Sequence, residues 1–563
     1  MIIAGMYLRT TQRKNKDGSV VRYVQLAHNR REGRSTVAEV LVNFGREDAL
    51  DLDGLRRLVH SINRYLGEEP GTDLSEPLGE GFAVRRARQM GTAWLLDALW
   101  HSLGIDAGLR RLLGGRRFSV DMERVLFALV ANRAIDPSSK LAASTWATED
   151  VAITGLAAMD EDQAYRAMDL LVAADSQAEV QEAVFFSVAN LLNLEVDLLF
   201  FDTSSTYFEL DEEDGAGEGF RVLGHSKDHR PDLPQIVIGL AVTREGIPVR
   251  VWCFPGDASD QKLLARVRDD LRHWRLGRVV TVVDRGFSSD DNLAYLTHGG
   301  GHYIAGEKMR DGSADAQAAL SRAGRYRVVR DNLEVKEVRL GPEGTRRFVV
   351  CHNPAEAVRD KAERDEKVAR VEAELARIAA ARAADKKRPF DDTAHARAEC
   401  ALRDHEALGR YVRQLPSGRL VLDRGRIRSE ERLDGKYLLS TSDPELSAED
   451  VALGYKNLLE AERGFRDLKS TLLLRPVYHR LEARIRAHVL LCWLALLLIR
   501  VAERRSGMTW RQISTELRRV HAVELAGLTG SLVQTTALTP AQGAILAACA
   551  AAKPPKVTVL QPS

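Results

Sequence analysis

Cysteine is scarce in this chain: there are five in 563 residues, and no two of them form a CxxC pair. Scattered cysteines argue against a disulfide framework and against a cysteine-based zinc site, and they favour a reducing compartment. The N-terminal residues also lack the charged start and the long apolar stretch of a secretory signal peptide. We therefore expect a cytoplasmic protein.

Long apolar runs are missing as well. The longest, at residues 489–499, has eleven residues and lies between Arg486 and Arg500. A membrane-spanning helix needs roughly 20 apolar residues, so this run predicts a buried helix of a soluble protein. We expect no membrane partner.

The chain has almost no net charge, because 81 Lys and Arg side chains face 80 Asp and Glu side chains. A balanced total does not indicate nucleic-acid binding, but it hides local asymmetry. Residues 1–46 carry nine basic side chains against three acidic ones, and residues 455–506 carry eleven against five. Positive charge is therefore concentrated in two segments.

The length of the chain is too great for one core, and about three or four domains are expected. Residues 1–50 predict a β-meander, because three β-branched or aromatic runs are separated by turn signals. With the linker after it, this meander makes a predicted N-terminal domain at 1–75. From 76 to 192 the apolar residues recur at helical spacing and predict an all-α domain.

A mixed α/β core is expected after residue 192, where short apolar runs typical of buried strands begin. We predict its first part at 193–305 and its second part at 437–506. Between them lies a predicted insertion domain at 306–436, with an exposed, highly charged helical stretch that turns near 386–389. The last segment, 507–563, is predicted as a helical region that ends in a mobile tail.

Two aspartates follow apolar runs that predict buried strands. Asp202 comes after residues 198–201, and Asp284 comes after residues 279–283. An acid at the exit of a buried strand can project at the carboxyl edge of a sheet, where open α/β sheets build their sites. Taken singly, each is more typical of an aspartate that starts a loop or caps a helix. A sugar-kinase-like phosphate loop would need glycine where Ser204 stands, and no GxxxxGK[ST] loop occurs.

A third acid lies in a charged segment near the end of the predicted core. Read as one helix, residues 455–469 place Tyr455, Glu462, Arg466 and Lys469 within an arc of roughly 60°. The alternative is a solvated face with charge pairs, which is common on surface helices.

Taken together, Asp202, Asp284 and Glu462 suit two-metal catalysis. Two Mg²⁺ (or Mn²⁺) ions about 3.5–4 Å apart need hard oxygen ligands and leave room for phosphate oxygens. The three carboxylates are therefore the candidate metal ligands and catalytic residues.

The order of these motifs resembles the DDE transposases of bacterial insertion sequences. The likeness is to the superfamily with the signature Tyr-x₂-Arg-x₃-Glu-x₆-Lys, in its insertion-sequence-four-like branch with long insertions. Tyr455, Glu462 and Lys469 match that signature in residue and spacing. The phrases at 224–235, 256–260 and 475–479 look like the same branch, and the resemblance covers roughly residues 190–500.

The resemblance implies a ribonuclease-H-like core, cleavage of DNA at the element's ends with two metals, and transfer of the freed 3′-OH to target DNA. By position, the three carboxylates would hold the metals, and Tyr455 and Lys469 would contact the DNA backbone near the scissile phosphate. The implied partners are the terminal inverted repeats and target DNA. A homodimer in the synaptic complex and a nucleoid-associated location in the cytoplasm are also implied.

The chain departs from the family pattern in two places. The signature arginine is Leu458 here, and Arg463 or Arg466 would replace it, with Arg466 on the better face. Relatives stack a tryptophan of the insertion on a flipped base while a hairpin forms, but no Trp lies between Trp274 and Trp493. Either the pathway avoids a hairpin or another ring serves, the candidates being Tyr303, Tyr326 and Phe390.

Further DNA contacts are expected from Lys227 and Arg230 in the polar loop after the first aspartate, with a solvated loop as the alternative. The two basic segments suit backbone contacts, which give affinity but carry little sequence information. The domains at 1–75 and 76–192 are candidates for end recognition and dimerisation, although neither shows a clean helix-turn-helix. Two other functions stay open: a ribonuclease-H-like nuclease or resolvase, and a non-catalytic DNA-binding protein derived from a transposase.

Overall fold

The computed structural model describes residues 6–14, 20–32, 35–51, 54–55, 59, 82–113, 121–175, 179–192, 198–210, 212–215, 219–274, 279–310, 313–384, 393–477, 479–527 and 530–562. They belong to two compact units. The first consists of Met1–Ala87, Val523–Gln534 and Val557–Ser563, and the second of Arg88–Ala522 and Thr535–Lys556.

The N-terminal meander of the first unit is a three-stranded antiparallel sheet. Its strands are β1 (Met6–Lys14), β2 (Val20–Glu32) and β3 (Ser35–Arg46), with β2 in the middle. The sequence predicted three strands at these places. Both pairings are antiparallel, as short connections between successive strands require.

A second, four-stranded sheet has the order β18-β17-β16-β4. Its strands are β4 (Phe82–Gln89), β16 (His521–Gly527), β17 (Gly530–Thr535) and β18 (Val557–Pro562). The expectation of a mobile C-terminal tail is therefore wrong for 557–562, because β18 pairs antiparallel with β17 from Gly530↔Pro562 to Gln534↔Val557. The alternating Val-Thr-Val-Leu of this segment is a strand pattern that follows the helix-breaking Pro-Pro.

The second unit contains a layer of helices in the region predicted as all-α. The helices are α2 (Gly91–Ser102), α3 (Ile105–Leu112), α4 (Met122–Ile135), α5 (Lys140–Thr145), α6 (Glu161–Ala174) and α7 (Glu179–Leu192). Side-chain caps fix several starts: Asp121 and Ser139 accept backbone N–H groups, and Asp160 forms a capping box with Gln163.

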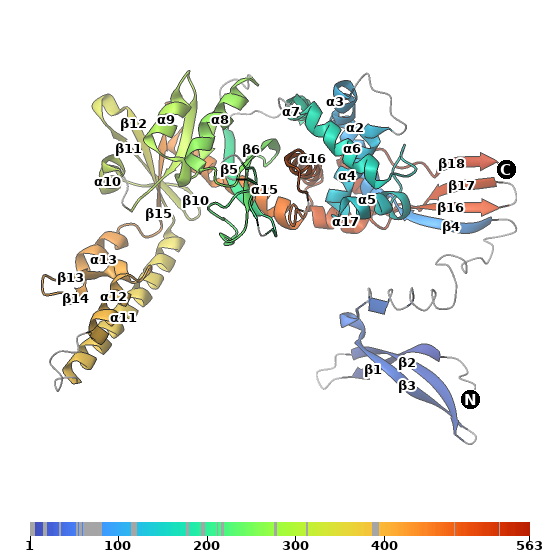
Figure 1. The fold of residues 1–563 in the computed structure, drawn as a ribbon, viewed down its shortest axis with the longest axis horizontal. Coiled ribbons are helices and arrows are strands. Elements are labelled where there is room, and N and C mark those ends of the chain that lie inside the picture. The colour runs from blue at the N-terminus through green and yellow to red at the C-terminus, as the bar shows by residue number, and fades with distance from the viewer. Residues whose placement is uncertain are drawn as a thin grey trace. The chain divides into compact units, whose positions relative to one another are not determined.

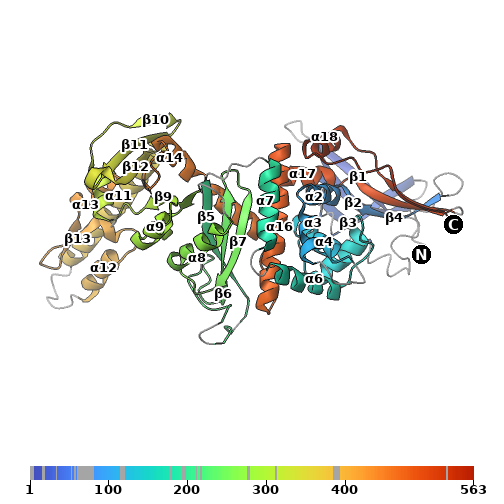
Figure 2. The same cartoon turned by 90° about the horizontal axis from the view of Figure 1, so that it is seen from above.

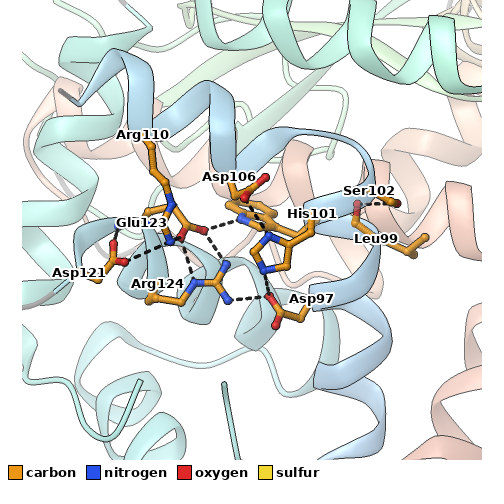
Figure 3. Close-up of polar contacts among 10 residues, drawn as sticks. Asp97, Leu99, His101, Ser102, Asp106, Arg110, Asp121, Glu123 and Arg124 are labelled. Carbon is orange, nitrogen blue, oxygen red and sulfur yellow. Dashed lines mark hydrogen bonds and ion pairs between the residues drawn. The ribbon is translucent and has the colours of Figure 1, made fainter. Parts of the chain in front are cut away.

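Buried charges join three of these helices (Figure 3). The Arg124 guanidinium donates to Asp97 and to Glu123, each at 2.6 Å, and Trp100 Nε1 donates to Glu123 at 2.6 Å. The side chains of Arg124 and Glu123 are 5% and 1% exposed. Removing one partner from such a network leaves an uncompensated buried charge, so the network fixes how α2 packs on α4.

The centre of the helical layer comes from far along the chain. Helix α16 (Glu482–Ser506) packs on α4 and α6 on one side and on strand β7 (Pro248–Pro255) on the other, as Figure 2 shows. It is long and apolar enough to cross a membrane, but 94% of its apolar window is buried inside the protein. The apolar run at 489–499 is therefore the buried helix that the sequence predicted.

The other half of the second unit, which contains β5, β12 and α8 in Figure 1, is built on a nine-stranded sheet. The strand order is β10-β11-β12-β15-β9-β8-β5-β6-β7. The strands beside β7 are β5 (Leu198–Tyr207), β6 (Gln235–Thr243), β8 (Val280–Val283) and β9 (His302–Glu307). Strands β5, β8 and β9 are parallel, whereas β5, β6 and β7 form an antiparallel meander. Helices α8 (Asp260–Arg272) and α9 (Asp290–Thr297) precede β8 and β9, as parallel connections require.

The segment 306–436, predicted as one insertion domain, contributes in two ways. Strands β10 (Arg327–Arg330), β11 (Leu333–Leu340) and β12 (Arg346–His352) extend the nine-stranded sheet and join it through β15 (Lys436–Thr441). The rest surrounds a small hydrophobic core of its own. Its elements are α11 (Pro354–Ala384), α12 (Thr393–Arg403), β13 (Val412–Gln414), β14 (Leu420–Leu422) and α13 (Arg424–Glu431). The turn predicted near 386–389 lies outside the described residues.

Candidate active site

Asp202 and Asp284 lie side by side on neighbouring parallel strands. The register pairs Phe201 of β5 with Val283 of β8, so the next residue of each strand is an aspartate. Adjacent strands are about 4.8 Å apart, which makes the two carboxylates neighbours. Asp284 follows the end of β8, as predicted. Asp202 lies inside β5, which runs on to Tyr207, so the expectation that a strand ends at Asp202 is wrong.

Strand alternation shows which face the aspartates share. Phe201 and Val283 pack into the core that contains α8 and α9. Phe200 and Val282, one residue earlier, pack with Phe465 in the core on the opposite face. Side chains alternate along a strand, so Asp202 and Asp284 belong to this second face.

Two helices cover that second face, α14 (Ala448–Lys456) and α15 (Leu459–Ser470). Close approach is possible because each helix carries a glycine at the contact. A Cβ on Gly454 would meet Leu198 Cδ1 at 3.0 Å, and a Cβ on Gly464 would meet Leu240 Cδ2 at 2.8 Å. The sequence predicted one continuous helix here, and that is wrong: the chain turns at Asn457 before α15 begins. The reason is packing, because Leu458 lies in the hydrophobic core, where it is only 7% exposed.

Tyr455 connects α14 to the second aspartate. Its hydroxyl donates to Asp284 Oδ1 at 2.8 Å. A Cβ on Gly306 would lie 2.3 Å from the Tyr455 hydroxyl oxygen, so the phenol rests directly on β9. Burial, followed by the charge of Asp284, raises the pKa of Tyr455 well above its ordinary value. The phenol therefore stays protonated and acts as a hydrogen-bond donor to the carboxylate.

Glu462 lies one turn into α15, and its side chain is exposed. Helix α15, which carries Glu462, packs on β5 and β6 of the same sheet. The structure thus places Asp202 beside Asp284, sets Tyr455 against Asp284, and carries Glu462 on a helix that packs on the same sheet. In the part of the chain that the structure describes, no three His, Cys, Asp or Glu side chains are close enough to hold one metal ion. Carboxylate oxygens are the type of ligand that Mg²⁺ prefers, but these carboxylates do not form a complete coordination shell here.

Lys469, predicted to contact a DNA phosphate, forms an ion pair with Asp228 in this structure, and its DNA contact stays a prediction. Its Nζ lies 2.8 Å from Asp228 Oδ1, and Arg475 Nη1 lies 2.8 Å from Asp228 Oδ2. Burial lowers the pKa of Lys469, and hydrogen bonding to Asp228 raises it in part. Sequence analysis gave no role to Asp228 or Arg475, although both lie in phrases that resemble the family.

The loop that carries Asp228 is attached to β5. Lys227 Nζ donates to the Thr203 carbonyl oxygen at 3.0 Å and to Thr203 Oγ1 at 2.5 Å. Arg230 pairs with Asp232 at 2.8 Å. This loop therefore lies next to Asp202, and the DNA contacts of Lys227 and Arg230 stay predictions.

The two candidates for the missing signature arginine differ in their surroundings. Arg463 lies 3.9 Å from Glu460 and 3.8 Å from Glu503, so its charge is partly balanced. Arg466 has an exposed side chain. Of the aromatic candidates, Tyr303 and Tyr326 are half-buried, and Phe390 lies outside the described residues.

Comparison with known families matches two parts of the chain. Residues 8–75 match the N-terminal domain of the IS1634 family transposases, and residues 218–498 match the transposase DDE domain. The chain is an insertion-sequence DDE transposase. The second match contains Asp284, Tyr455, Glu462 and Lys469, and Asp202 precedes it.

Among solved structures, the transposase is similar to the piggyBac transposase synaptic complex with hairpin DNA, determined by cryo-EM. The two chains share 10% sequence identity over 76% of this chain and 78% of that one, with a TM-score of 0.34. No curated protein matches the transposase.

Proposed function

We propose that this transposase cleaves DNA at the ends of its element and joins the freed 3′-OH ends to target DNA. The observation that carries the proposal is the register of β5 and β8, which sets Asp202 beside Asp284 on the face covered by α14 and α15. Asp202, Asp284 and Glu462 would hold two Mg²⁺ or Mn²⁺ ions. When bound, such ions lower the pKa of a water or 3′-OH nucleophile and stabilise the leaving oxygen.

The transposase's own residues would orient these ligands and the DNA. The protonated phenol of Tyr455 fixes Asp284 through the 2.8 Å hydrogen bond, so this carboxylate faces the site before DNA arrives. Lys469, Arg466 and Arg463 would contact backbone phosphates, and Lys227 and Arg230 would line the DNA path. Phosphate contacts give affinity and register, and they carry no sequence information.

The core is proposed to be ribonuclease-H-like. An antiparallel meander of β5, β6 and β7, with β8 and β9 parallel to β5, supports this proposal. Sites in sheets of this kind lie at the carboxyl ends of the parallel strands, and Asp284 lies at such an end.

The remaining parts would serve the DNA substrate. The β-rich domain at 1–75 and the helical layer are proposed to bind the terminal inverted repeats, and a homodimer would hold two ends in the synaptic complex. The place of action would be the cytoplasm, on the nucleoid. A nuclease or resolvase with the same carboxylates is the second candidate, because the paired aspartates alone support hydrolysis without joining.

A joining assay tests the proposal. The transposase is incubated with Mg²⁺, a labelled duplex that carries the element's end, and a target plasmid. Joined product is expected, and Glu462→Gln should abolish cleavage while binding of the end stays near wild type. Cleavage without joining would support the nuclease, and binding without cleavage would support a non-catalytic protein.

A further inference from the structure

We infer that Asp228 is a positioning residue, which holds Lys469 and Arg475 so that their free N–H groups meet a DNA phosphate. The inference rests on the proposed function and deepens it. Asp228 belongs to the loop between β5 and β6, whereas Lys469 ends α15 and Arg475 follows that helix. One carboxylate therefore ties three separate segments together beside the proposed site.

The burial of the three side chains differs in a useful way. Asp228 is 9% exposed, Lys469 16% and Arg475 33%, so the carboxylate lies beneath and the cations reach toward solvent. A lysine ammonium has three N–H donors and an arginine guanidinium has five. Lys469 donates one of its N–H groups to Asp228 Oδ1, and Arg475 pairs with Asp228 Oδ2 by charge, which leaves donors of both cations for a phosphate. The buried carboxylate therefore supports the two cations and leaves their remaining N–H groups available to an anion.

The loop itself is held in place by the strand that carries Asp202. The Lys227 backbone N–H donates to Ser205 Oγ at 2.8 Å, and the Lys227 side chain is bonded to Thr203. The ring of Tyr207, at the end of β5, has Arg230 at 5.4 Å and Arg475 at 5.6 Å. The cations are thus set at a fixed place relative to the first aspartate, and that geometry is what catalysis at a phosphate requires.

The local charge explains why a carboxylate is needed there. Burial lowers the pKa of Lys469, Asp228 opposes this effect, and the charges of Arg475 and Lys227 lower the pKa further. Without Asp228, like charges would push the cations apart. With a neutral residue at position 228, Lys469 and Arg475 should still attract the DNA, but they should hold its phosphate in the wrong position.

The test compares Asp228→Asn with the wild type in the full-length chain, using a labelled end duplex and a target plasmid. Asp228→Asn should bind the duplex as tightly as the wild type or tighter, because one negative charge is lost. It should cut and join roughly ten- to a hundredfold more slowly, the range for loss of a hydrogen bond between charged groups. In the Lys469→Met background, Asp228→Asn should cause a smaller loss than in the wild type, because only Arg475 is left for the carboxylate to position.

Each other result overturns the inference. Wild-type rates in Asp228→Asn would show that the carboxylate positions nothing, and faster rates would make it an inhibitor. Additive losses with Lys469→Met would mean a merely structural role. Asp270→Asn is the matched control: it breaks the 2.9 Å pair with Arg250, away from these residues, and should leave joining unchanged.

Two further comparisons keep the test decisive. If Asp228→Asn melts early, Arg475→Lys and Arg475→Met test the cluster from the cation side. Arg475→Lys should retain much more joining than Arg475→Met, and equal losses would contradict the inference. Failure of the wild type to cut or join would overturn the proposed function, whereas a wild type that joins and an unaffected Asp228→Asn overturn only the role of Asp228.

Discussion

A single methyl group at position 306 should disable the site. An ideal Cβ on Gly306 would lie 2.3 Å from the Tyr455 hydroxyl oxygen and 2.9 Å from Tyr455 Cζ, whereas ordinary contact begins at 3.4 Å. The phenol must therefore retreat by about 1 Å, the difference between these distances. Such a shift breaks the 2.8 Å hydrogen bond to Asp284. The backbone itself tolerates alanine, because residue 306 is in a regular strand.

The size of the effect follows from two terms. Overpacking of a well-packed site costs about 1–3 kcal/mol of unfolding free energy. A hydrogen bond to a charged group contributes about 1.5–3 kcal/mol, and its loss at Asp284 corresponds to a decrease in joining rate of roughly tenfold or more. Tyr455→Phe removes the same bond without the clash, so it should slow joining by a similar factor at a smaller cost in melting temperature.

The assay measures thermal unfolding and the joining rate of Gly306→Ala, Tyr455→Phe and the double variant. The losses in joining should not add, because both changes remove one contact. Gly108→Ala is the control, since a Cβ there meets nothing within 4 Å and alanine favours the helix. Wild-type joining by Gly306→Ala would refute the placement of Tyr455 against Asp284.

Three other predictions concern the rest of the transposase. Leu458→Arg, which restores the family's signature arginine, should lower the melting temperature strongly instead of raising activity, because position 458 is 7% exposed and a charge there is buried. Asp175→Asn should stabilise the protein at neutral pH, because burial raises the pKa of Asp175 from 3.8 to about 6. Ionising this carboxyl therefore destabilises the folded state increasingly as the pH rises from 4 to 6. The increase in melting temperature should be smaller when thermal unfolding is measured at acidic pH. Deletion of residues 354–434 should leave a folded core. The deletion joins Asn353 to Gly435 as an Asn-Gly hairpin turn between His352 and Lys436, which are already paired. A circular dichroism spectrum typical of an unfolded chain would contradict this prediction.

Periodicity predicted the parts of the site that depend on local pattern. The apolar runs before Asp202 and Asp284 form adjacent strands, whereas the role of Glu462, which rests on the family signature, stays a prediction. The sequence also predicted the buried helix at 489–499, because eleven apolar residues without a charge have no other stable place in a folded chain.

Tertiary packing decided the rest. The helix break at Asn457 arises because α14 and α15 cover different strands, and helical periodicity carries no signal of that choice. The pair of Asp228 and Lys469 joins residues 241 positions apart, so no local pattern reveals it. The pairing of β16 with β4 is equally long-range, whereas β17 and β18, which were also missed, pair within the C-terminal segment.

The most direct test of the central claim is a change of metal preference at Asp202. In Asp202→Cys a thiolate replaces a carboxylate oxygen, and thiolates bind softer metals in preference to Mg²⁺. The proposed ligand role predicts that this variant joins no DNA with Mg²⁺ and recovers joining with Mn²⁺, while the wild type works with both. Equal activity in both metals would contradict the assignment of Asp202 as a metal ligand, and so would equal inactivity of a folded, DNA-binding variant.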